Sequence, residues 1–135
     1  MIFVDTGAFL ARYMRPDGHH RAARRAWAQI ERGSIRCFTS SFVLDETFTL
    51  LGRRSSYSFA AGRARALLGS AVLTILRPDS DDEGRAVELF EKFADQKLSF
   101  TDAVSFALMR RHRLARAFTF DRHFARAGFE IVPGG

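Results

Sequence analysis

The chain has 135 residues, of which 47% are hydrophobic and 27% charged, and this suits one globular domain spanning residues 1–135. No run of about 20 apolar residues could cross a membrane, and the N-terminus lacks the basic region of a signal peptide, so we expect a cytoplasmic protein. The net charge of +6 favours a polyanionic partner, although an arginine-favouring base composition or an acidic protein partner would also explain it.

Apolar runs and amphipathic segments alternate along the chain. In chain order, the runs predict buried or half-buried strands over residues 1–4, 35–39, 72–76, 117–120 and 128–132. Helical spacing of apolar residues predicts helices between them, over residues 6–13, 19–32, 41–53, 55–68 and 101–112, with another that opens at the acidic run 79–83. Acids in a first helical turn complement the helix dipole, so this acidic run needs no functional explanation.

Strands that alternate with helices predict an α/β fold with a mostly parallel sheet of four or five strands and helices on both faces. Functional sites in such sheets form beyond the carboxyl ends of the strands. Asp5 and Asp121 lie at that edge if their strands are parallel. The pattern therefore predicts a site before any motif is considered.

Four acids interrupt apolar runs, where an unpaired carboxylate is costly to bury. They are Asp5 in IFVDTG, Glu46 in VLDETF, Asp102 in LSFTDA and Asp121 in FTFDRHF. Each has a local alternative: a helix N-cap for Asp5, an ion pair with an arginine for Glu46, a capping box with Ser99 for Asp102, and a turn for Asp121.

Glu46 shares a helix face with Val43 and Leu50, three and four residues away. Asp45 lies about 100° further around the helix, so only one of the two acids can easily point into a common cleft. The apolar turn next to Glu46 favours Glu46 as the acid that does so.

Four converging carboxylates would repel one another and would bind either protons or a cation. Carboxylate ligands suit hard cations such as Mg²⁺ or Mn²⁺. Zinc is disfavoured, because the four histidines have no metal-binding spacing with one another or with the single Cys37. A Mg²⁺ site of this kind typically performs phosphoryl chemistry, activating water and stabilising charge on the attacking and leaving oxygens.

Several arginines close to these motifs in sequence are candidate nucleic-acid phosphate contacts, although a solvated helix face is the simpler interpretation. They are Arg12, Arg15, Arg110, Arg111 and Arg113.

The order and the flanking residues of the four motifs resemble the PIN-domain ribonucleases, and most closely the VapC-type toxins of type II toxin–antitoxin systems. The resemblance covers almost the whole chain, from IFVDTGAFLA through SSFVLDETFTLL and LSFTDAVSFALMRR to AFTFDRHFARAGFEIV. It implies that Asp5, Glu46, Asp102 and Asp121 hold Mg²⁺ or Mn²⁺ and activate water to cleave RNA phosphodiester bonds.

The resemblance further implies that Thr6 orients a carboxylate and that Thr119, in the final T-x-D pattern, supports the ligands. It also implies a homodimer and a cognate antitoxin protein that blocks the cleft. Two alternatives stand beside it. One is a non-catalytic PIN-like module that binds RNA or protein, which the presence of all four acids disfavours. The other is an aspartyl-nucleophile phosphatase, which would want a second Asp where Gly7 stands.

Overall fold

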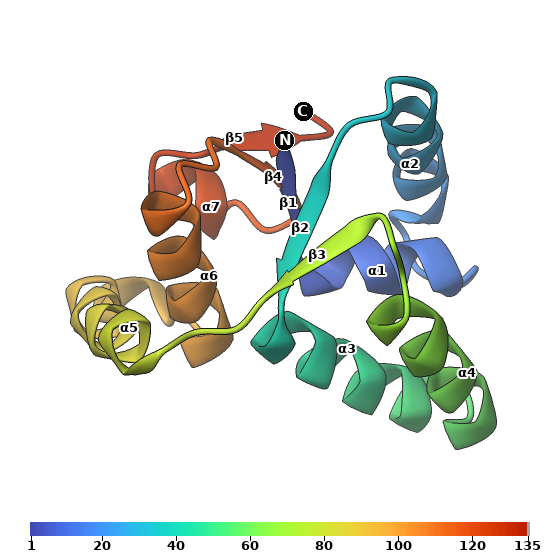
Figure 1. The fold of residues 1–135 in the computed structure, drawn as a ribbon, viewed down its shortest axis with the longest axis horizontal. Coiled ribbons are helices and arrows are strands. Elements are labelled where there is room, and N and C mark those ends of the chain that lie inside the picture. Colours follow the sequence, from blue (N-terminus) through green and yellow to red (C-terminus); the bar gives the residue numbers. More distant parts are fainter. Residues whose placement is uncertain (135) are drawn as a thin grey trace.

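The computed structural model describes residues 1–134 and contains a five-stranded sheet with helices on both faces (Figure 1). The strands are β1 (Ile2–Val4), β2 (Cys37–Ser40), β3 (Leu73–Leu76), β4 (Arg116–Phe118) and β5 (Glu130–Val132). The helices are α1 (Thr6–Tyr13), α2 (His20–Arg32), α3 (Ser41–Arg54), α4 (Tyr57–Leu68), α5 (Ser80–Lys92), α6 (Phe100–Arg111) and α7 (His123–Arg126), with a 3-10 helix, η1 (Ala94–Gln96), after α5. None of these helices is both long enough and apolar enough to cross a membrane.

The strand order is β3-β2-β1-β4-β5, and every neighbouring pair is parallel, which confirms the predicted α/β class. The central strand β1 is buried along its whole length, as expected for a strand covered on both faces. The chain lays β2 and β3 on one side of β1, and β4 and β5 on the other. The strand order therefore changes direction between β1 and β4, and such a switch point opens a crevice at the carboxyl ends of the strands.

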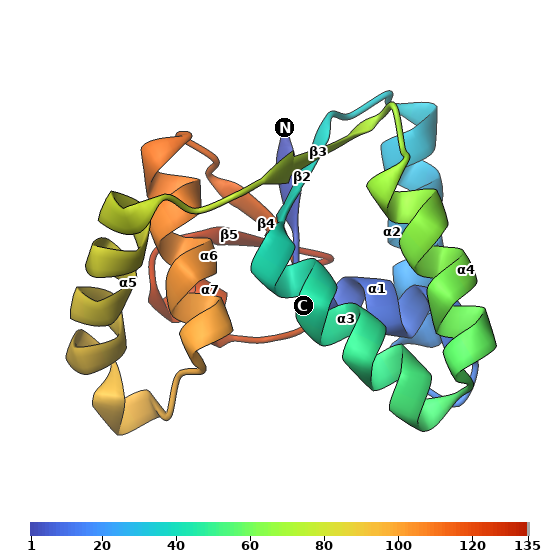
Figure 2. The same ribbon diagram turned by 60° about the horizontal axis from the view of Figure 1, so that its bottom comes forward.

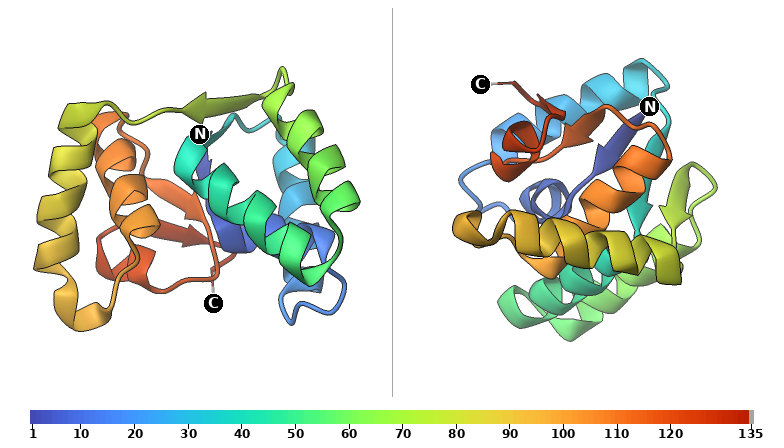
Figure 3. Two further views of the ribbon diagram at one scale, coloured as in Figure 1. Left: turned by 90° about the horizontal axis from the view of Figure 1, so that it is seen from below. Right: turned by 90° about the vertical axis from the view of Figure 1, so that its left-hand side faces the viewer.

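The helices form two layers, with α1 to α4 on one side of the sheet and α5, α6 and α7 on the other (Figures 1 and 3). Trp27 ties the first layer to the sheet, because its ring packs 5.0 Å from that of Phe118 and 5.7 Å from that of Phe9, measured between centroids. One helix of each layer, α3 and α6, contact each other (Figure 2). These two helices flank the crevice.

Local capping fixes where several helices begin. Ser40, Ser56 and Ser99 each accept a hydrogen bond from the backbone N–H three residues further on, the usual N-cap arrangement. The acidic run forms a complete capping box, in which Asp79 and Asp82 each accept the other's backbone N–H. This confirms that the run has a structural explanation.

Element boundaries lie within two residues of the predicted ones, and α1 has the predicted bounds at both ends. Two short elements were not predicted. The unpredicted elements are η1 and α7, of three and four residues. Neither is long enough to show a helical repeat of apolar residues. In α7, Phe124 is fully buried, so tertiary packing rather than sequence periodicity accounts for this turn.

Candidate metal centre

Asp5 follows β1 directly and is only 5% exposed. Its backbone N–H donates to the carbonyl of Phe118 at 3.0 Å, which extends the pairing of β1 with β4 by one residue. Although Asp5 stands at the N-cap of α1, its side chain makes no capping hydrogen bond. Asp5 therefore does not cap α1 through its side chain, which was the alternative to a metal-binding role. Its carboxylate instead lies near those of Asp102 and Asp121, whose charges raise its pKa.

Thr119 lies beside Asp5 because of the same strand pairing. Its buried hydroxyl donates to Asp5 Oδ2 at 2.8 Å and accepts the backbone N–H of Asp121 at 3.0 Å. One hydroxyl therefore connects the acid that follows β1 with the acid that follows β4.

Asp102 lies in the first turn of α6, where its backbone N–H donates to Ser99 Oγ at 3.1 Å. The reciprocal bond, from the Ser99 backbone N–H to the Asp102 carboxylate, is not among the hydrogen bonds found in residues 1–134. Half of the predicted capping box is thus present. It holds the backbone of Asp102 and leaves the carboxylate free to point at the crevice.

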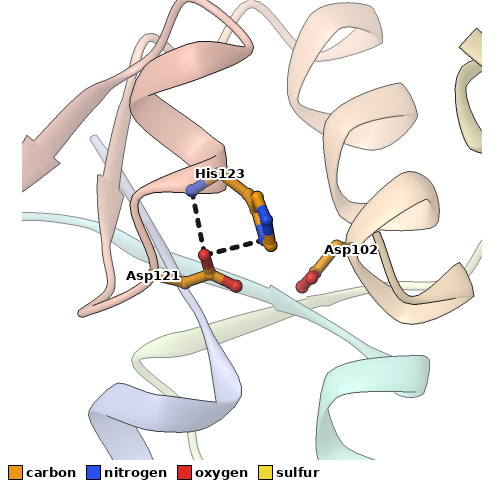
Figure 4. A group of neighbouring side chains, drawn as sticks. All are labelled: Asp102, Asp121 and His123. Carbon is orange, nitrogen blue, oxygen red and sulfur yellow. Dashed lines mark hydrogen bonds and ion pairs between the residues drawn. The ribbon is translucent and has the colours of Figure 1, made fainter. Parts of the chain in front are cut away.

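Asp121 does form the turn that was predicted as an alternative to metal binding. Its Oδ1 accepts the backbone N–H of His123 at 2.9 Å, and the His123 Nδ1 atom lies 2.9 Å from the same oxygen. No hydrogen bond to Asp121 Oδ2 is found in the described part of the chain. The turn uses one carboxylate oxygen and leaves the other toward Asp102 (Figure 4).

Potential ligand atoms of Asp102, Asp121 and His123 all lie within 4.8 Å of one another. Figure 4 shows the two carboxylates facing each other from α6 and from the loop after β4, with the imidazole beside them. Asp5 and Glu46 lie outside this tight group. The charge of Asp102 nevertheless raises the pKa of Asp5, and the charge of Glu46 raises the pKa of Asp102.

Glu46, on α3, is half-buried, whereas its neighbour Asp45 is exposed. The charge of Glu46 raises the pKa of Asp102, so Glu46 is the acid of α3 that faces the crevice. The ion pairs found in residues 1–134 include none between Glu46 and an arginine. The structure thus brings an acid from the opposite helical layer toward Asp102.

Burial, together with the charges of Asp102 and then Asp121, raises the pKa of Asp5 to about 7, against the opposing effect of hydrogen bonds from Thr119 and the Thr6 backbone. Burial and the charge of Asp121 likewise raise the pKa of Asp102 to about 6. Without a cation, the cluster therefore tends to hold protons near neutral pH.

The cluster also lacks a permanently charged basic side chain, since the basic group beside it is the imidazole of His123, paired with Asp121. No lysine or arginine forms an ion pair with its carboxylates anywhere in residues 1–134. Two buried polar atoms at the site, Thr6 Oγ1 and His123 Nδ1, have no hydrogen-bond partner there. Uncompensated carboxylates beside unsatisfied polar atoms fit a hydrated divalent cation.

Thr6 differs from what the resemblance implied. Its hydroxyl contacts no carboxylate, whereas its backbone N–H acts on Asp5 and lowers the pKa of that acid. Thr119, by contrast, contacts Asp5 through its side chain.

Arg110, Arg111 and Arg113 are not brought to the acids, although they follow Asp102 closely in sequence. A helix rises about 1.5 Å per residue, so Asp102 and Arg111 lie roughly 13 Å apart along α6, at opposite ends. Arg111 is moreover paired with Asp79, at 3.3 Å, and with Asp82. These arginines are therefore close to Asp102 in the sequence but not in space, and their contact with RNA stays a prediction.

Arg12 and Arg15 lie near the end of α1 and line a groove with Tyr13, His20 and Arg24, among others. The Arg12 guanidinium lies 4.5 Å from the Trp27 ring centroid, in an arrangement typical of cation–π contacts, and it pairs with Glu31 at 3.4 Å. Arg15 is exposed. Of the five predicted RNA contacts, Arg12 lies on α1, the helix that begins beside Asp5, and Arg15 follows the end of that helix.

His123 is the member of this close group that sequence reasoning missed. The histidines were compared with one another and with Cys37, and that comparison found no metal-binding spacing. The informative spacing was instead to an acid, because His123 stands two residues after Asp121, where an Asx turn folds it back onto the carboxylate.

With this geometry established, known proteins provide a comparison. The PIN domain family matches residues 2–130, and the chain belongs to it. The chain is 39% identical over 134 residues to the 23S rRNA-specific endonuclease VapC20 of Mycobacterium tuberculosis, covering 98% of this chain and 99% of that protein. It is 30% identical over 126 residues to a VapC ribonuclease of Archaeoglobus fulgidus, covering 90% of this chain and 78% of the relative. These similarities confirm the VapC-type resemblance.

Solved structures agree. The crystal structure of Mycobacterium tuberculosis VapC20, described as a Sarcin-Ricin loop cleaving toxin, matches with a TM-score of 0.87 and 37% identity over 96% of both chains. The DNA-bound VapBC complex of Salmonella typhimurium matches with a TM-score of 0.69 and 14% identity over 97% of both chains, which is a likeness of fold.

Proposed function

We propose that this protein is a divalent-metal-dependent endoribonuclease and the toxin of a toxin–antitoxin pair. The observation that carries the proposal is the group of Asp5, Asp102 and Asp121 at the switch point of the sheet, unpaired with any lysine or arginine of residues 1–134. It is supported by family membership and by 39% identity to an RNA endonuclease.

In this proposal Asp5, Asp102 and Asp121 hold the cation, and Glu46 binds it directly or through water. Thr119 fixes the Asp5 carboxylate and the backbone of Asp121, so that the ligands need little rearrangement. A bound divalent ion would supply a water of lowered pKa and positive charge for the phosphodiester in its transition state. The oxygen-rich ligand set favours Mg²⁺, with Mn²⁺ as a substitute.

Because the relative from Mycobacterium tuberculosis is named for 23S rRNA cleavage, 23S ribosomal RNA is the first substrate to test. Arg12, in the last turn of α1, and Arg15, just after this helix, are proposed phosphate contacts for RNA that extends along the groove they line. Arg110, Arg111 and Arg113 could contact only RNA that extends past the far end of α6. A homodimer and a cognate antitoxin complete the proposal, and ribosomal RNA as substrate would make the protein cytoplasmic.

The decisive experiment maps cleavage sites on 23S rRNA in purified ribosomes, with Mg²⁺, for wild type, Asp5→Asn and the control Asp45→Asn. We expect Asp5→Asn to lose at least about 100-fold in cleavage rate while circular dichroism shows an unchanged fold. Asp45 is exposed on α3 next to Glu46, so Asp45→Asn should cleave as wild type does. Cleavage retained by Asp5→Asn would reject the proposed metal centre, whereas a wild type that neither cleaves RNA nor binds Mn²⁺ would favour the non-catalytic alternative.

A further inference from the structure

The imidazole of His123 stands at the candidate metal centre, where its recorded contact is the ion pair with Asp121. Its Nδ1 lies 2.9 Å from Asp121 Oδ1, yet this atom is buried and has no aligned hydrogen bond in residues 1–134. A buried ring nitrogen without a partner is uncommon in a folded protein. The neighbouring backbone N–H already makes the bond that closes the turn, so the ring is not needed for the turn.

The ring belongs to the same space as the two carboxylates. Potential ligand atoms of these three residues, Asp102, Asp121 and His123, lie within 4.8 Å of one another. The charge of His123 lowers the pKa of Asp102. Figure 4 shows the imidazole beside Asp121, on the side toward Asp102. One ion about 2.1 Å from each donor spans roughly 4.2 Å between opposite ligands, so a small inward movement would let all three bind one ion.

We propose that His123 contributes a nitrogen ligand to the cation held by Asp102 and Asp121, and that this ligand raises the affinity for Mn²⁺ or a later transition metal more than it raises that for Mg²⁺. This inference rests on the proposed metal-dependent function. Imidazole nitrogen binds transition metals well, whereas Mg²⁺ strongly prefers oxygen. The mixed ligand set therefore differs from the carboxylate-only site that the sequence predicted.

The alternative is that His123 only positions Asp121. In that case its loss would weaken Mn²⁺ and Mg²⁺ binding alike, and no metal–nitrogen contact would exist. A true nitrogen ligand would instead affect Mn²⁺ selectively, so the two roles separate without any activity measurement.

In the test, Mn²⁺ alone is added to the wild-type protein, His123→Ala, His123→Gln and the control His112→Ala. His112 ends α6, at the edge of the sheet away from the acids. Pulsed electron paramagnetic resonance detects ¹⁴N nuclei coupled to Mn²⁺, and calorimetry gives Kd for Mn²⁺ and Mg²⁺. We expect ¹⁴N coupling in wild type and in His112→Ala but in neither His123 variant. We also expect Mn²⁺ binding to weaken about tenfold or more in the His123 variants, with a change of less than about threefold for Mg²⁺.

Mn²⁺ bound by wild type without ¹⁴N coupling would overturn the inference and leave the proposed function standing. So would equal losses of Mn²⁺ and Mg²⁺ affinity. Absence of Mn²⁺ binding by wild type would overturn both. The wild-type spectrum needs no variant to fold, and His123→Gln keeps a polar side chain of similar length, so a failure of His123→Ala to fold would not remove the test.

Discussion

Asp5 and Asp82 are both buried carboxylates at the start of a helix, but only Asp82 has basic side chains beside it. Asp82 is fully buried, pairs with Arg111 and lies 3.5 Å from Arg85, and it also accepts the backbone N–H of Asp79. Asp5 has a single side-chain donor, the Thr119 hydroxyl, and its charged neighbours are acids.

The contrast is informative because the chain has 21 lysines and arginines and could have placed one beside Asp5. Where a carboxylate serves the fold, an arginine compensates it. Where the carboxylates converge at the switch point, the positive charge must come from outside, as protons or as a cation.

The largest expected effect is on the pH dependence of stability of the metal-free protein. The pKa of Asp5 is about 7 in the folded state, above the ordinary value of 3.8, so between these values the folded protein holds a proton that the unfolded chain has released. The resulting stabilisation is complete below about pH 3.8 and is lost as pH rises through about 7. It is on the order of 4 kcal/mol.

Urea denaturation in EDTA from pH 4.5 to 8 measures this effect, and the difference between wild type and Asp5→Asn isolates it from other titrating groups. Asp5→Asn should become the more stable protein as pH rises. Excess Mg²⁺ or Mn²⁺ should restore wild-type stability at pH 8 and should do little for the variant. A pH-independent difference between the two proteins would mean that Asp5 is not held in a repulsive cluster.

Substitution of Asp82, the acid that is paired with arginine, should instead destabilise the protein and leave RNA cleavage nearly unchanged. Asp82→Ala breaks a buried ion pair and half of the capping box, and we expect a loss of about 3 kcal/mol in unfolding free energy, at the low end for such pairs because Arg111 is 42% exposed and can be rehydrated. RNA cleavage per folded molecule should stay within about twofold of wild type.

Thermal and urea denaturation, with cleavage assayed well below the melting temperature, check this expectation. Asp81→Ala is the matched control, since Asp81 is exposed in the same helical turn. Equal stability of the two variants would show that the Asp82–Arg111 pair contributes nothing net, and a selective loss of cleavage would show that the two acidic groups are not independent.

The sequence sufficed to predict the fold and to single out the four acids, because both depend on strong, local signals. Buried strands are continuous apolar runs, and a charged residue that interrupts such a run is conspicuous, as at Asp5 after Ile2–Val4. The parallel order then predicted that Asp5 and Asp121 meet at one edge, although the identity of β1 and β4 as neighbours comes only from the structure.

Two features were missed because they depend on the direction in which a helix runs and on the geometry of a short turn. Arg111 is near Asp102 in sequence but far from it in space, because a helix separates its ends. His123 begins a helix of only four residues, which is too short for a periodic pattern, so its position beside Asp121 could not be predicted from spacing rules for histidine pairs.

The smallest expected effect tests whether Thr119 serves the site as well as the fold. Thr119 and Thr39 are both buried threonines whose hydroxyls donate at 2.8 Å, Thr119 to the Asp5 carboxylate and Thr39 to the Val4 carbonyl. Valine at either position removes one hydroxyl at nearly constant volume and should cost about 1 kcal/mol of unfolding free energy.

The two variants should differ in metal binding. Thr119→Val frees the Asp5 carboxylate and the Asp121 backbone from their shared hydroxyl, and we expect divalent-metal affinity to fall about tenfold, in the range for groups that orient metal ligands. Thr39→Val should bind metal as wild type does, because its hydroxyl contacts backbone only. Calorimetry with Mn²⁺ measures the affinities. If both variants bound Mn²⁺ equally well, the Thr119 hydroxyl would be a structural bond between β1 and β4 and nothing more, and the preorganisation of the acids would have to come from the strand pairing itself.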